Sequence, residues 1–333
     1  MLICKDGAIL DSQVIKLADF LQEGDVLVFN DARVIKAKLS GEILRNSAWL
    51  DFNLDKKVVS RKSTVVSQGE DWWALCRPAK KVKIGDEIKI APDFFAQVLE
   101  KTDDGFIKIK FDCGEEELLA KLERYGAVPL PPYIKREAIG DRRKALGEDD
   151  QENYQTIYAA NGTAVAAPTA GLHFNEKIFA ALDAKKIEKV FVTLNVGAGT
   201  FLPVRSEFLK DHKMHSEFFS ISKSAAEKIN FAKKSGRKIV AIGTTSLRVL
   251  ESATDENGLV KPMSAHTEIF IHPPYKFKIT DILLTNFHLP KSTLFMLICT
   301  FVGKEKAFEL YNHAISQNYR FYSYGDSSLL FKS

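Results

Sequence analysis

Apolar stretches that stop abruptly at small or polar residues recur along the second half of the chain. In the first of them, Val165–Phe174, the apolar run ends at Pro168 and a turn of small residues leads to His173 and to Asn175, which can cap a helix. Three later segments have the same form: 192–200, 239–246 and 282–291. Because strand ends of an α/β fold usually converge on one cleft, the pattern predicts a single site built from several loops.

Strands and helices are predicted to alternate from about residue 156 onwards. This order favours an α/β main domain with a largely parallel, barrel-like sheet and flanking helices. Amphipathic patterns predict helices over 175–186, 223–234 and 304–316, and two more that begin near Gly243 and Ser292.

Near the amino terminus, Val26–Phe29 is a continuous apolar run of the kind that is buried on both faces of a sheet. A polar cluster follows directly: Asn30, Asp31 and Arg33. The cluster is either a surface turn or a ligand-binding loop, and the pattern alone leaves both readings open.

From about residue 49 to 114 the pattern changes to short alternating runs with glycines at the turns, and Asp104-Gly105 is a strong hairpin signal. The first amphipathic helix after these runs is predicted over 115–125. We therefore expect an all-β barrel or sandwich inserted into the α/β domain. Residues 1–50 and 150–333 are assigned to a discontinuous α/β catalytic domain, and 51–149 to an inserted β-barrel domain with a return crossing.

Composition bounds the class of protein. The chain has 333 residues, enough for about two domains, and its apolar fraction of 45% is ample for packed cores. A formal charge of +4 permits a polyanionic partner without requiring one. The four cysteines show no C-x-x-C spacing, which is typical of buried free thiols in a reducing compartment. The apolar run Leu294–Val302 is far too short to span a bilayer. We expect a cytoplasmic monomer.

The turn Gly243-Thr244-Thr245-Ser246 has the clearest chemical meaning. Free N–H groups at a helix start, with two threonine hydroxyls, can bind a carboxylate or phosphate, and Arg248 one turn later can add a bidentate contact. The turn matches neither the P-loop nor the dinucleotide-binding pattern. A plain capped helix is the alternative reading.

Three histidines lie beside polar or proline-bounded turns: His173, His215 and His288. For each, a structural hydrogen-bonding role competes with a role as acid or base. His215 and Glu217 could form part of a metal site, but no second cluster has ligand spacing, so no metal is expected. The absence of a G-x-S-x-G pattern gives no support to hydrolase chemistry of that type.

Long blocks of the chain, in order, resemble the signature of the S-adenosylmethionine:tRNA ribosyltransferase-isomerase family of queuosine biosynthesis. The blocks run from about residue 26 to 330, and such ordered matches are far more specific than one short motif. They are Phe29–Val34, Pro129–Ile134, Tyr154–Tyr158, Ala166–Phe174, Gly197–Phe201, Met214–Glu217, Gly243–Arg248, Thr285–Thr293 and Tyr319–Asp326.

The resemblance implies a reaction in which the ribosyl part of S-adenosylmethionine moves onto the 7-aminomethyl group of preQ1 at the wobble position of tRNA. There it is isomerised to an epoxycyclopentanediol, while adenine and methionine leave. S-adenosylmethionine is then a substrate, no cofactor is bound permanently, and the macromolecular partner is the anticodon stem-loop of preQ1-modified tRNA. The resemblance also implies an α/β domain with an inserted β-barrel. No membrane partner is expected, because the apolar run at 294–302 is too short to span a bilayer.

This chemistry requires a base for the C5′ proton, a neutral amine, a leaving adenine and a negative or aromatic group near the sulfonium. We expect His173 or His288 as the base, with His215 as a further acid–base candidate, and Asp31 or Glu217 near the sulfonium or the amine. Thr244, Thr245 and Arg248 are expected on the methionine carboxylate. Arg33 and Lys291 are expected to hold tRNA phosphate or ribose, and Tyr324 and Asp326 to line the cleft. The other expected substrate contacts are Asn30, Thr169, Gly171, Thr200 and Asn286.

The chain departs from the family's pattern at two points. Asn195 stands where the family usually has histidine, so this position cannot be an acid–base group, and the family normally has a further stretch ahead of the strand at Met1–Ile3. Two other classes of function stay open beside the transferase. One is an S-adenosylmethionine-dependent methyltransferase, and the other is a non-catalytic or degenerate tRNA-binding homologue.

Overall fold

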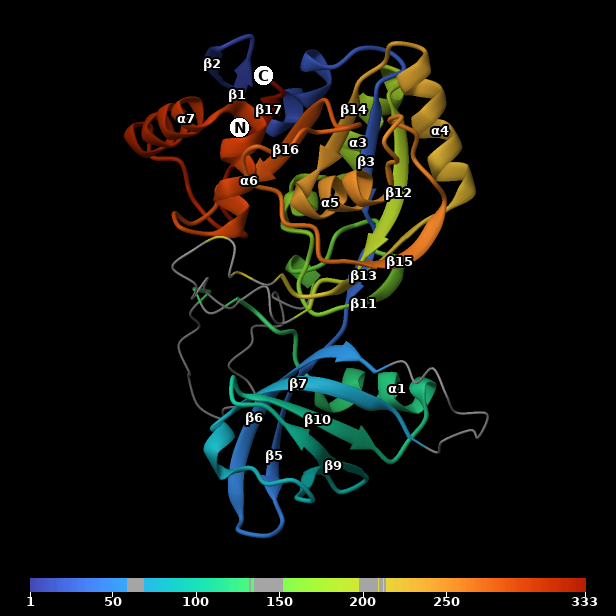
Figure 1. Cartoon of the computed structure of the whole chain (residues 1–333), viewed down its shortest axis with the longest axis vertical. Helices are drawn as coiled ribbons and strands as arrows, with labels where there is room; N and C mark the ends of the chain where they lie inside the picture. Colours follow the sequence, from blue (N-terminus) through green and yellow to red (C-terminus); the bar gives the residue numbers. More distant parts are fainter. Residues whose placement is uncertain (59–68, 132, 135–151, 198–208, 210–211, 213) are drawn as a thin grey trace.

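A mixed nine-stranded sheet forms one end of the molecule and a closed barrel forms the other (Figure 1). The computed structural model describes residues 1–58, 69–131, 133–134, 152–197, 209, 212 and 214–333. Across the sheet the strands are β15 (Met263–Thr267), β13 (Glu217–Ile221), β12 (Glu188–Leu194), β3 (Val26–Asn30), β14 (Ile239–Ile242), β16 (Ile282–Asn286), β17 (Ser327–Phe331), β1 (Leu2–Lys5) and β2 (Ala8–Asp11).

The centre of the sheet is parallel and its flanks contain antiparallel pairs. Strands β12, β3, β14 and β16 run in the same direction, with Val26 opposite both Glu188 and Ile239. Strand β13 pairs antiparallel with β12, and β17 pairs antiparallel with β16. The predicted α/β domain with its inserted barrel is therefore confirmed, and the parallel arrangement holds at the centre of a mixed sheet.

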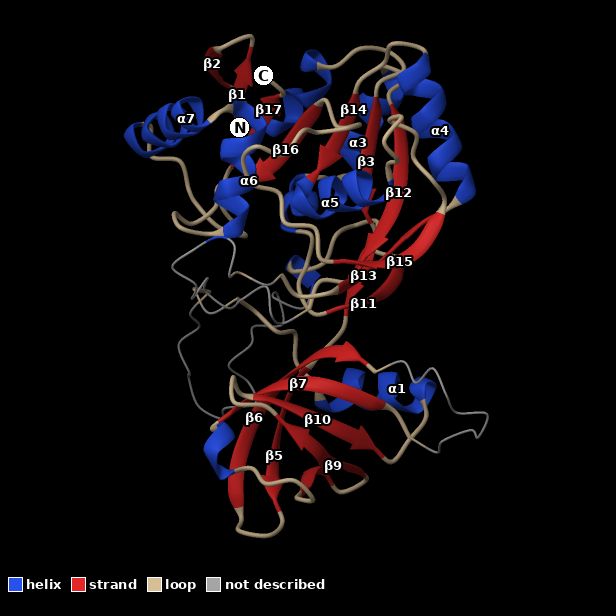
Figure 2. Ribbon diagram, in the orientation of Figure 1, coloured by secondary structure: helices blue, strands red, loops and turns tan. Residues whose placement is uncertain are grey.

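Alternating side chains of the central strands fill two separate cores. Val26 and Val28 of β3 face one core, whereas Leu27 and Phe29 face the other. Helices cover both faces (Figure 2). On the first face lie α4 (Lys223–Lys234), α5 (Gly243–Ala253), α6 (Thr293–Val302) and α7 (Lys304–Ser316), and on the second lie the 3₁₀ helices η1 (Val14–Phe20) and η3 (Thr169–His173) with α3 (Glu176–Ala184).

Side-chain caps fix where several of these helices begin. Asn175 accepts a hydrogen bond from the Ile178 amide at 3.0 Å, and Ser222 and Ser292 cap α4 and α6 in the same way. The helices predicted over 223–234, 304–316 and 115–125 are observed with those bounds. Near the amino terminus, the segment Val14–Phe20 forms the 3₁₀ helix η1.

The barrel is closed, and it is followed by helix α1 (Glu115–Tyr125). Around it the strands are β10 (Phe106–Phe111), β7 (Asp71–Arg77), β6 (Ala48–Lys57), β5 (Lys38–Ile43), β8 (Glu87–Ala91) and β9 (Phe94–Lys101). The expected boundary at residue 51 falls inside β6, because β5 already pairs with β6 to close the barrel. Most of the expected return crossing up to residue 149 lies outside the described residues.

The barrel meets the α/β part at the end where β12 stops and β13 starts. A Cβ on Gly197 would lie 2.5 Å from a carboxylate oxygen of Asp55 in β6, and the rings of Phe106 and His215 are 6.2 Å apart. A two-stranded parallel sheet of β4 (Ala32–Val34) and β11 (Asn161–Ala164) lies where the chain leaves for the barrel and returns. The inserted barrel therefore stands next to the edge of the main sheet at which β12 ends.

All four cysteines are free thiols, as predicted; Cys4, Cys76 and Cys113 are buried and Cys299 is half-buried. Burial raises the pKa of the Cys76 thiol to about 11, so it stays protonated at neutral pH. Among the described residues, no helix is both long enough and apolar enough to cross a membrane.

Candidate functional site

The predicted loops meet at one edge of the main sheet. Strands β12, β3, β14 and β16 are parallel and in register, so the segments after Leu194, Asn30, Ile242 and Asn286 leave from the same edge. Because β17 pairs antiparallel with β16, the segment that precedes Ser327 arrives at this edge as well. We call it the carboxyl edge of the sheet.

Helix η3 lies over the carboxyl edge and touches both β16 and α5. Gly243, the first residue of α5, has a φ of +85°, a conformation that glycine adopts without strain. A Cβ at this position would lie 3.3 Å from Thr245 Oγ1 and 3.4 Å from Ala170 Cβ. The absence of a side chain at Gly243 thus lets η3 lie close against the start of α5.

Asn286 joins three parts of the edge. Its amide nitrogen donates to the carbonyls of Tyr322 and Ser323 at 3.0 and 3.3 Å. Its amide oxygen lies 3.5 Å from the hydroxyl of Thr169, which donates to it. Asn286 is itself buried, so the predicted contacts Thr169 and Asn286 hold η3 and the 319–326 loop together.

Asp31 is a buried carboxylate whose partners are neutral. Thr193 Oγ1 donates to one oxygen at 2.7 Å, and the Asn161 amide donates to the other at 2.8 Å. Only 6% of the residue is exposed, and no described lysine or arginine forms an ion pair with it. A buried charge that lacks a cationic partner is suited to a positively charged ligand.

The other polar residues expected to contact the substrate near Asp31 differ in exposure to solvent. Asn30 is fully buried, and its side chain exchanges hydrogen bonds with the Leu194 backbone, so it fastens β3 to β12 instead of facing a ligand. Arg33 and Lys291 are exposed. Both are therefore accessible from solvent, and their contact with tRNA phosphate or ribose stays a prediction.

Glu217 and Arg248 form a buried ion pair between the start of β13 and the second turn of α5. The side chains are 5% and 9% exposed. The pairing ties together two residues that were expected to serve different parts of the substrate. Arg248 Nε and Nη2 have no partner among the described residues, which leaves two donors for a ligand.

His173 ends η3, and its Nε2 is shielded from solvent without a hydrogen-bond partner in the described part of the chain. Burial lowers the pKa of His173 to about 4, although the charge of Asp326 acts in the opposite direction. The imidazole is therefore neutral at pH 7. A neutral ring with a free nitrogen is able to accept a proton.

His288 lies on the other face of the sheet. Ile282 and Leu284 of β16 belong to the core beneath η3, whereas Leu283 faces the core of α6 and α7, and Thr285 points to that same side. His288 Nε2 lies 2.9 Å from Thr285 Oγ1, and its backbone amide donates to the hydroxyl of Tyr311 in α7. Burial lowers the pKa of His288 to about 4. The structure thus places the two alternative candidates for the base, His173 and His288, on opposite faces of the sheet.

The third histidine, His215, is exposed and lies beside Phe106 of the barrel. Its neighbour Glu217 pairs with Arg248, so His215 and Glu217, which were considered as part of a metal site and not expected to bind a metal, do not act as a free pair. Within the described ranges, no three histidine, cysteine or carboxylate side chains gather in a way that could hold a metal ion.

The 319–326 loop contributes Tyr324 and Asp326 to the carboxyl edge. Tyr324 is 38% exposed and its ring meets the buried Tyr154 edge-on. Burial alone would raise the pKa of Asp326, but the Arg320 amide and guanidinium lower it below its usual value. Asp326 is therefore charged at neutral pH and acts on His173 through space.

Buried polar atoms without partners concentrate at the carboxyl edge. Apart from Trp72 Nε1 in the barrel, every such atom among the described residues belongs to this region: Thr156 Oγ1, Tyr158 OH, His173 Nε2, Thr245 Oγ1, Arg248 Nε and Nη2, and Ser327 Oγ. Native proteins rarely leave such atoms unpaired. Their concentration indicates where a polar ligand binds.

Three of these residues were not singled out from the sequence: Thr156, Tyr158 and Ser327. A Cβ on Gly171 would lie 2.0 Å from the Tyr158 hydroxyl, so the glycine predicted as a substrate contact makes room for this tyrosine. Tyr158 also stacks edge-on against Phe29. The family-like block Tyr154–Tyr158 was the available signal, although pattern alone gave it no role.

Asn195, at the site where the family usually has histidine, accepts a hydrogen bond from the Thr163 amide at 3.2 Å and packs on Gly162. Thr200 lies outside the described residues.

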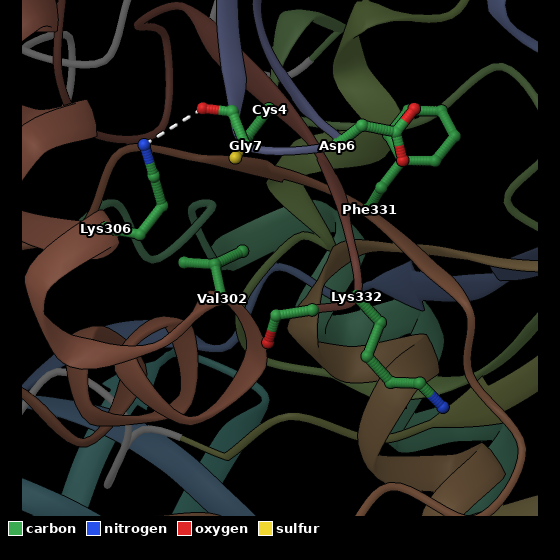
Figure 3. A pocket seen from close by; sticks show the side chains of 8 residues that line it. Cys4, Asp6, Gly7, Val302, Lys306, Phe331 and Lys332 are labelled. Carbon is green, nitrogen blue, oxygen red and sulfur yellow. Dashed lines mark hydrogen bonds between the residues drawn. The ribbon is translucent and has the colours of Figure 1, made fainter.

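A pocket of about 360 Å³ lies elsewhere (Figure 3). It is lined by residues at the ends of β1 and β17, including Cys4, Asp6 and Phe331, and by Lys306 of α7. Phe331 pairs with Ile282 at the start of β16, so this pocket is at the opposite edge of the sheet from the unpaired polar atoms. We place the candidate site at the carboxyl edge because the orphaned donors and acceptors of the described residues gather there.

Fold and site together define an α/β protein with an inserted β-barrel and a buried polar site at the carboxyl edge of its sheet. A sequence profile of the family described as queuosine biosynthesis protein matches residues 1–330. The chain belongs to this family.

Individual relatives agree. The S-adenosylmethionine:tRNA ribosyltransferase-isomerase of Zymomonas mobilis is 48% identical over 320 residues, 96% of this chain and 88% of the relative. The protein of the same name from Rhodospirillum rubrum is 49% identical, over 94% of this chain and 86% of the relative. The crystal structure of S-adenosylmethionine tRNA ribosyltransferase from Thermotoga maritima is similar with a TM-score of 0.50 at 29% identity, covering 99% of this chain and 90% of that one.

Proposed function

We propose that this protein is an S-adenosylmethionine:tRNA ribosyltransferase-isomerase, the activity that the names of its relatives state. It transfers the ribosyl part of S-adenosylmethionine to the 7-aminomethyl group of preQ1 at the wobble position of tRNA and isomerises it, releasing adenine and methionine. The observation that carries the proposal is the group of unpaired buried polar atoms at the carboxyl edge. A polar substrate bound there supplies the partners that these atoms lack.

The start of α5 binds the carboxylate of the methionine part. Its first N–H groups point out of the helix, and Thr245 Oγ1 together with Arg248 Nε and Nη2 adds unpaired donors. Glu217 holds the Arg248 side chain in place through their ion pair. A bidentate contact from a fixed guanidinium is a strong and directional way to bind a carboxylate.

Asp31 faces the positive charge of the substrate. It lies near Tyr158, whose pKa it helps to raise after burial, and Tyr158 contacts Phe29. A carboxylate beside aromatic rings suits a sulfonium, because the cation gains both a counter-charge and a ring face.

His173 removes the proton from C5′, which the adjacent sulfonium makes acidic. Its lowered pKa keeps the ring neutral at pH 7, and its Nε2 has no competing partner in the described residues. Asp326 then stabilises the imidazolium that forms, because its negative charge acts on this ring. Of the two expected bases, His173 fits better, since His288 is bonded to Thr285 on the opposite face.

The reaction is tested by incubating the protein with preQ1-containing tRNA and S-adenosylmethionine and measuring adenine and epoxyqueuosine. Both should appear in equal amounts. Release of S-adenosylhomocysteine instead would identify a methyltransferase, and release of nothing would leave only a tRNA-binding protein. His173→Gln should lower the rate by about 10²–10⁴-fold, the usual contribution of a general base. His266→Gln, at an exposed histidine of β15, is the matched control and should keep the full rate.

We also propose that the barrel is a domain of its own that starts at β5, and that the protein works in the cytoplasm as a monomer. The separate domain is supported by the barrel's own core, which contains none of the side chains from the central strands of the main sheet. Light scattering during gel filtration should give the mass of a single chain, and a doubled mass would contradict the monomer.

A further inference from the structure

Tyr322, in the loop between α7 and β17, has an unusual backbone. Its φ is +75°, in the left-handed region that bulky residues avoid. Such a conformation persists only when the surrounding structure holds it, and it occurs preferentially at functional positions.

The carboxyl edge itself holds Tyr322 in place. Its carbonyl accepts from the buried Asn286 amide at 3.0 Å and from the Gly325 amide at 3.0 Å, while its own amide donates to the Phe287 carbonyl at 3.2 Å. The loop is thus fixed to the end of β16, beside the residues proposed to bind S-adenosylmethionine.

The aromatic ring of Tyr322 is partly exposed to solvent. Tyr322 stacks on Tyr133 with ring centres 4.6 Å apart and planes at 23°, and the Tyr133 hydroxyl lies 2.7 Å from Ser323 Oγ. Tyr133 is 42% and Tyr322 38% exposed. Two stacked aromatic rings that stay this exposed form a surface on which a further flat ring can stack.

Exposed positive charge lies on two loops at the carboxyl edge, the one that carries Tyr322 and the one that follows β16. Arg320, two residues before Tyr322, has a side chain that is 76% exposed, and its ion pair with Asp326 is long, at 3.5 Å. Lys291, on the loop that follows Asn286, is exposed and has no ion pair with a described residue. Exposed cations beside exposed aromatic rings are the combination that binds single-stranded nucleic acid.

We propose that the pair Tyr133–Tyr322 is a stacking platform for an unpaired base of the tRNA anticodon loop, with Arg320 and Lys291 contacting its phosphates. This rests on the proposed function and deepens it, because it names the surface that holds the RNA beside the reaction site. A base splayed out of a loop stacks on tyrosine whatever its identity. The platform therefore positions the loop without selecting its sequence.

The test measures binding of a fluorescent preQ1-containing anticodon stem-loop by anisotropy. Tyr322→Gly removes the ring and accommodates the positive φ without strain, so it should raise the Kd about 5- to 150-fold, the effect of losing one stacked base. Tyr322→Phe keeps the ring and should bind like the wild type. Phe231→Ala, at a 74% exposed ring on α4, is the matched control and should also leave the Kd unchanged.

Calorimetry with S-adenosylmethionine alone separates the two proposals. Tyr322→Gly should bind it with unchanged affinity, and Tyr133→Leu should show a smaller loss of RNA affinity than Tyr322→Gly. An unchanged RNA Kd for Tyr322→Gly would overturn the platform even if the wild type releases adenine. A wild type that binds the stem-loop through Tyr322 but releases no adenine would instead overturn the proposed function alone.

Discussion

Replacing Glu217 by glutamine tests whether this carboxylate balances the buried positive charge of Arg248 in the candidate site. The substitution keeps the size of the side chain and removes the negative charge that faces Arg248. Both side chains are more than nine-tenths buried, so water cannot solvate the guanidinium in place of the lost carboxylate. An unpaired charge in such a place is costly, whereas the pair itself contributes little net stability.

The structure sets the expected size of the effect. Breaking a buried ion pair from one side lowers the free energy of unfolding by ~3–5 kcal/mol. For an α/β part of this size, each kcal/mol corresponds to ~2–4 °C in Tm, so Glu217→Gln should melt about 6–20 °C lower than the wild type. Glu23→Gln breaks the exposed pair with Lys186, and it should leave Tm within about 1–2 °C.

The ligand provides the sharper assay. If Arg248 binds the methionine carboxylate, S-adenosylmethionine supplies the counter-charge that Glu217→Gln lacks. At one fixed ligand concentration, differential scanning fluorimetry should then show a larger gain in Tm for Glu217→Gln than for the wild type. The double variant Glu217→Leu with Arg248→Met removes both charges, and it should regain much of the lost stability but show little gain with ligand.

Two results would refute this reasoning. A Glu217→Gln protein as stable as the wild type would mean that the ion pair does not carry the charge of Arg248. Equal gains in Tm from the ligand would mean that Arg248 does not meet the substrate carboxylate.

Three further predictions concern other parts of the carboxyl edge. Burial holds the pKa of His173 and His288 near 4, below the ordinary 6.5, so the unfolded chain binds protons at a higher pH than the folded chain does. The urea midpoint should therefore fall as the pH drops from about 6.5 to 4, and a flat wild-type profile would contradict the assignment. His288→Gln should make this fall smaller while retaining turnover. Asp31→Asn should raise the Kd for S-adenosylmethionine about 10- to 100-fold in calorimetry, with little change for S-adenosylhomocysteine, whose sulfur carries no charge. Equal losses for both ligands would exclude a contact with the sulfonium. Gly243→Ala should lower the free energy of unfolding in urea by ~1–2 kcal/mol, because a φ of +85° is strained for a residue with a Cβ. An unchanged urea midpoint would show that the backbone at the start of α5 adapts to the side chain.

Much of the architecture follows from local pattern. The buried run at Val26–Phe29 gave the central strand, and the cap at Asn175 gave the start of α3. Helix bounds at 223–234 and 304–316 followed from apolar periodicity together with flanking glycine or polar residues. Such features depend on contacts between residues close in the chain, which is why they are legible in the sequence. The position of the barrel's first strand was not, since Lys38–Ile43 is identified only by its pairing with β6 and β8.

The sequence by itself determined that polar turns follow buried strands, and hence that a site lies where those strands end. Only the tertiary structure decided which side chains share it. Strand alternation sends Thr285 to the face opposite His173, and His288 bonds to Thr285 there. The antiparallel pairing of β13 with β12 brings Glu217 to Arg248. These outcomes depend on register and on the face to which a residue points, and a shift of one residue would reverse them. No local pattern fixes such a relation between segments far apart in the chain.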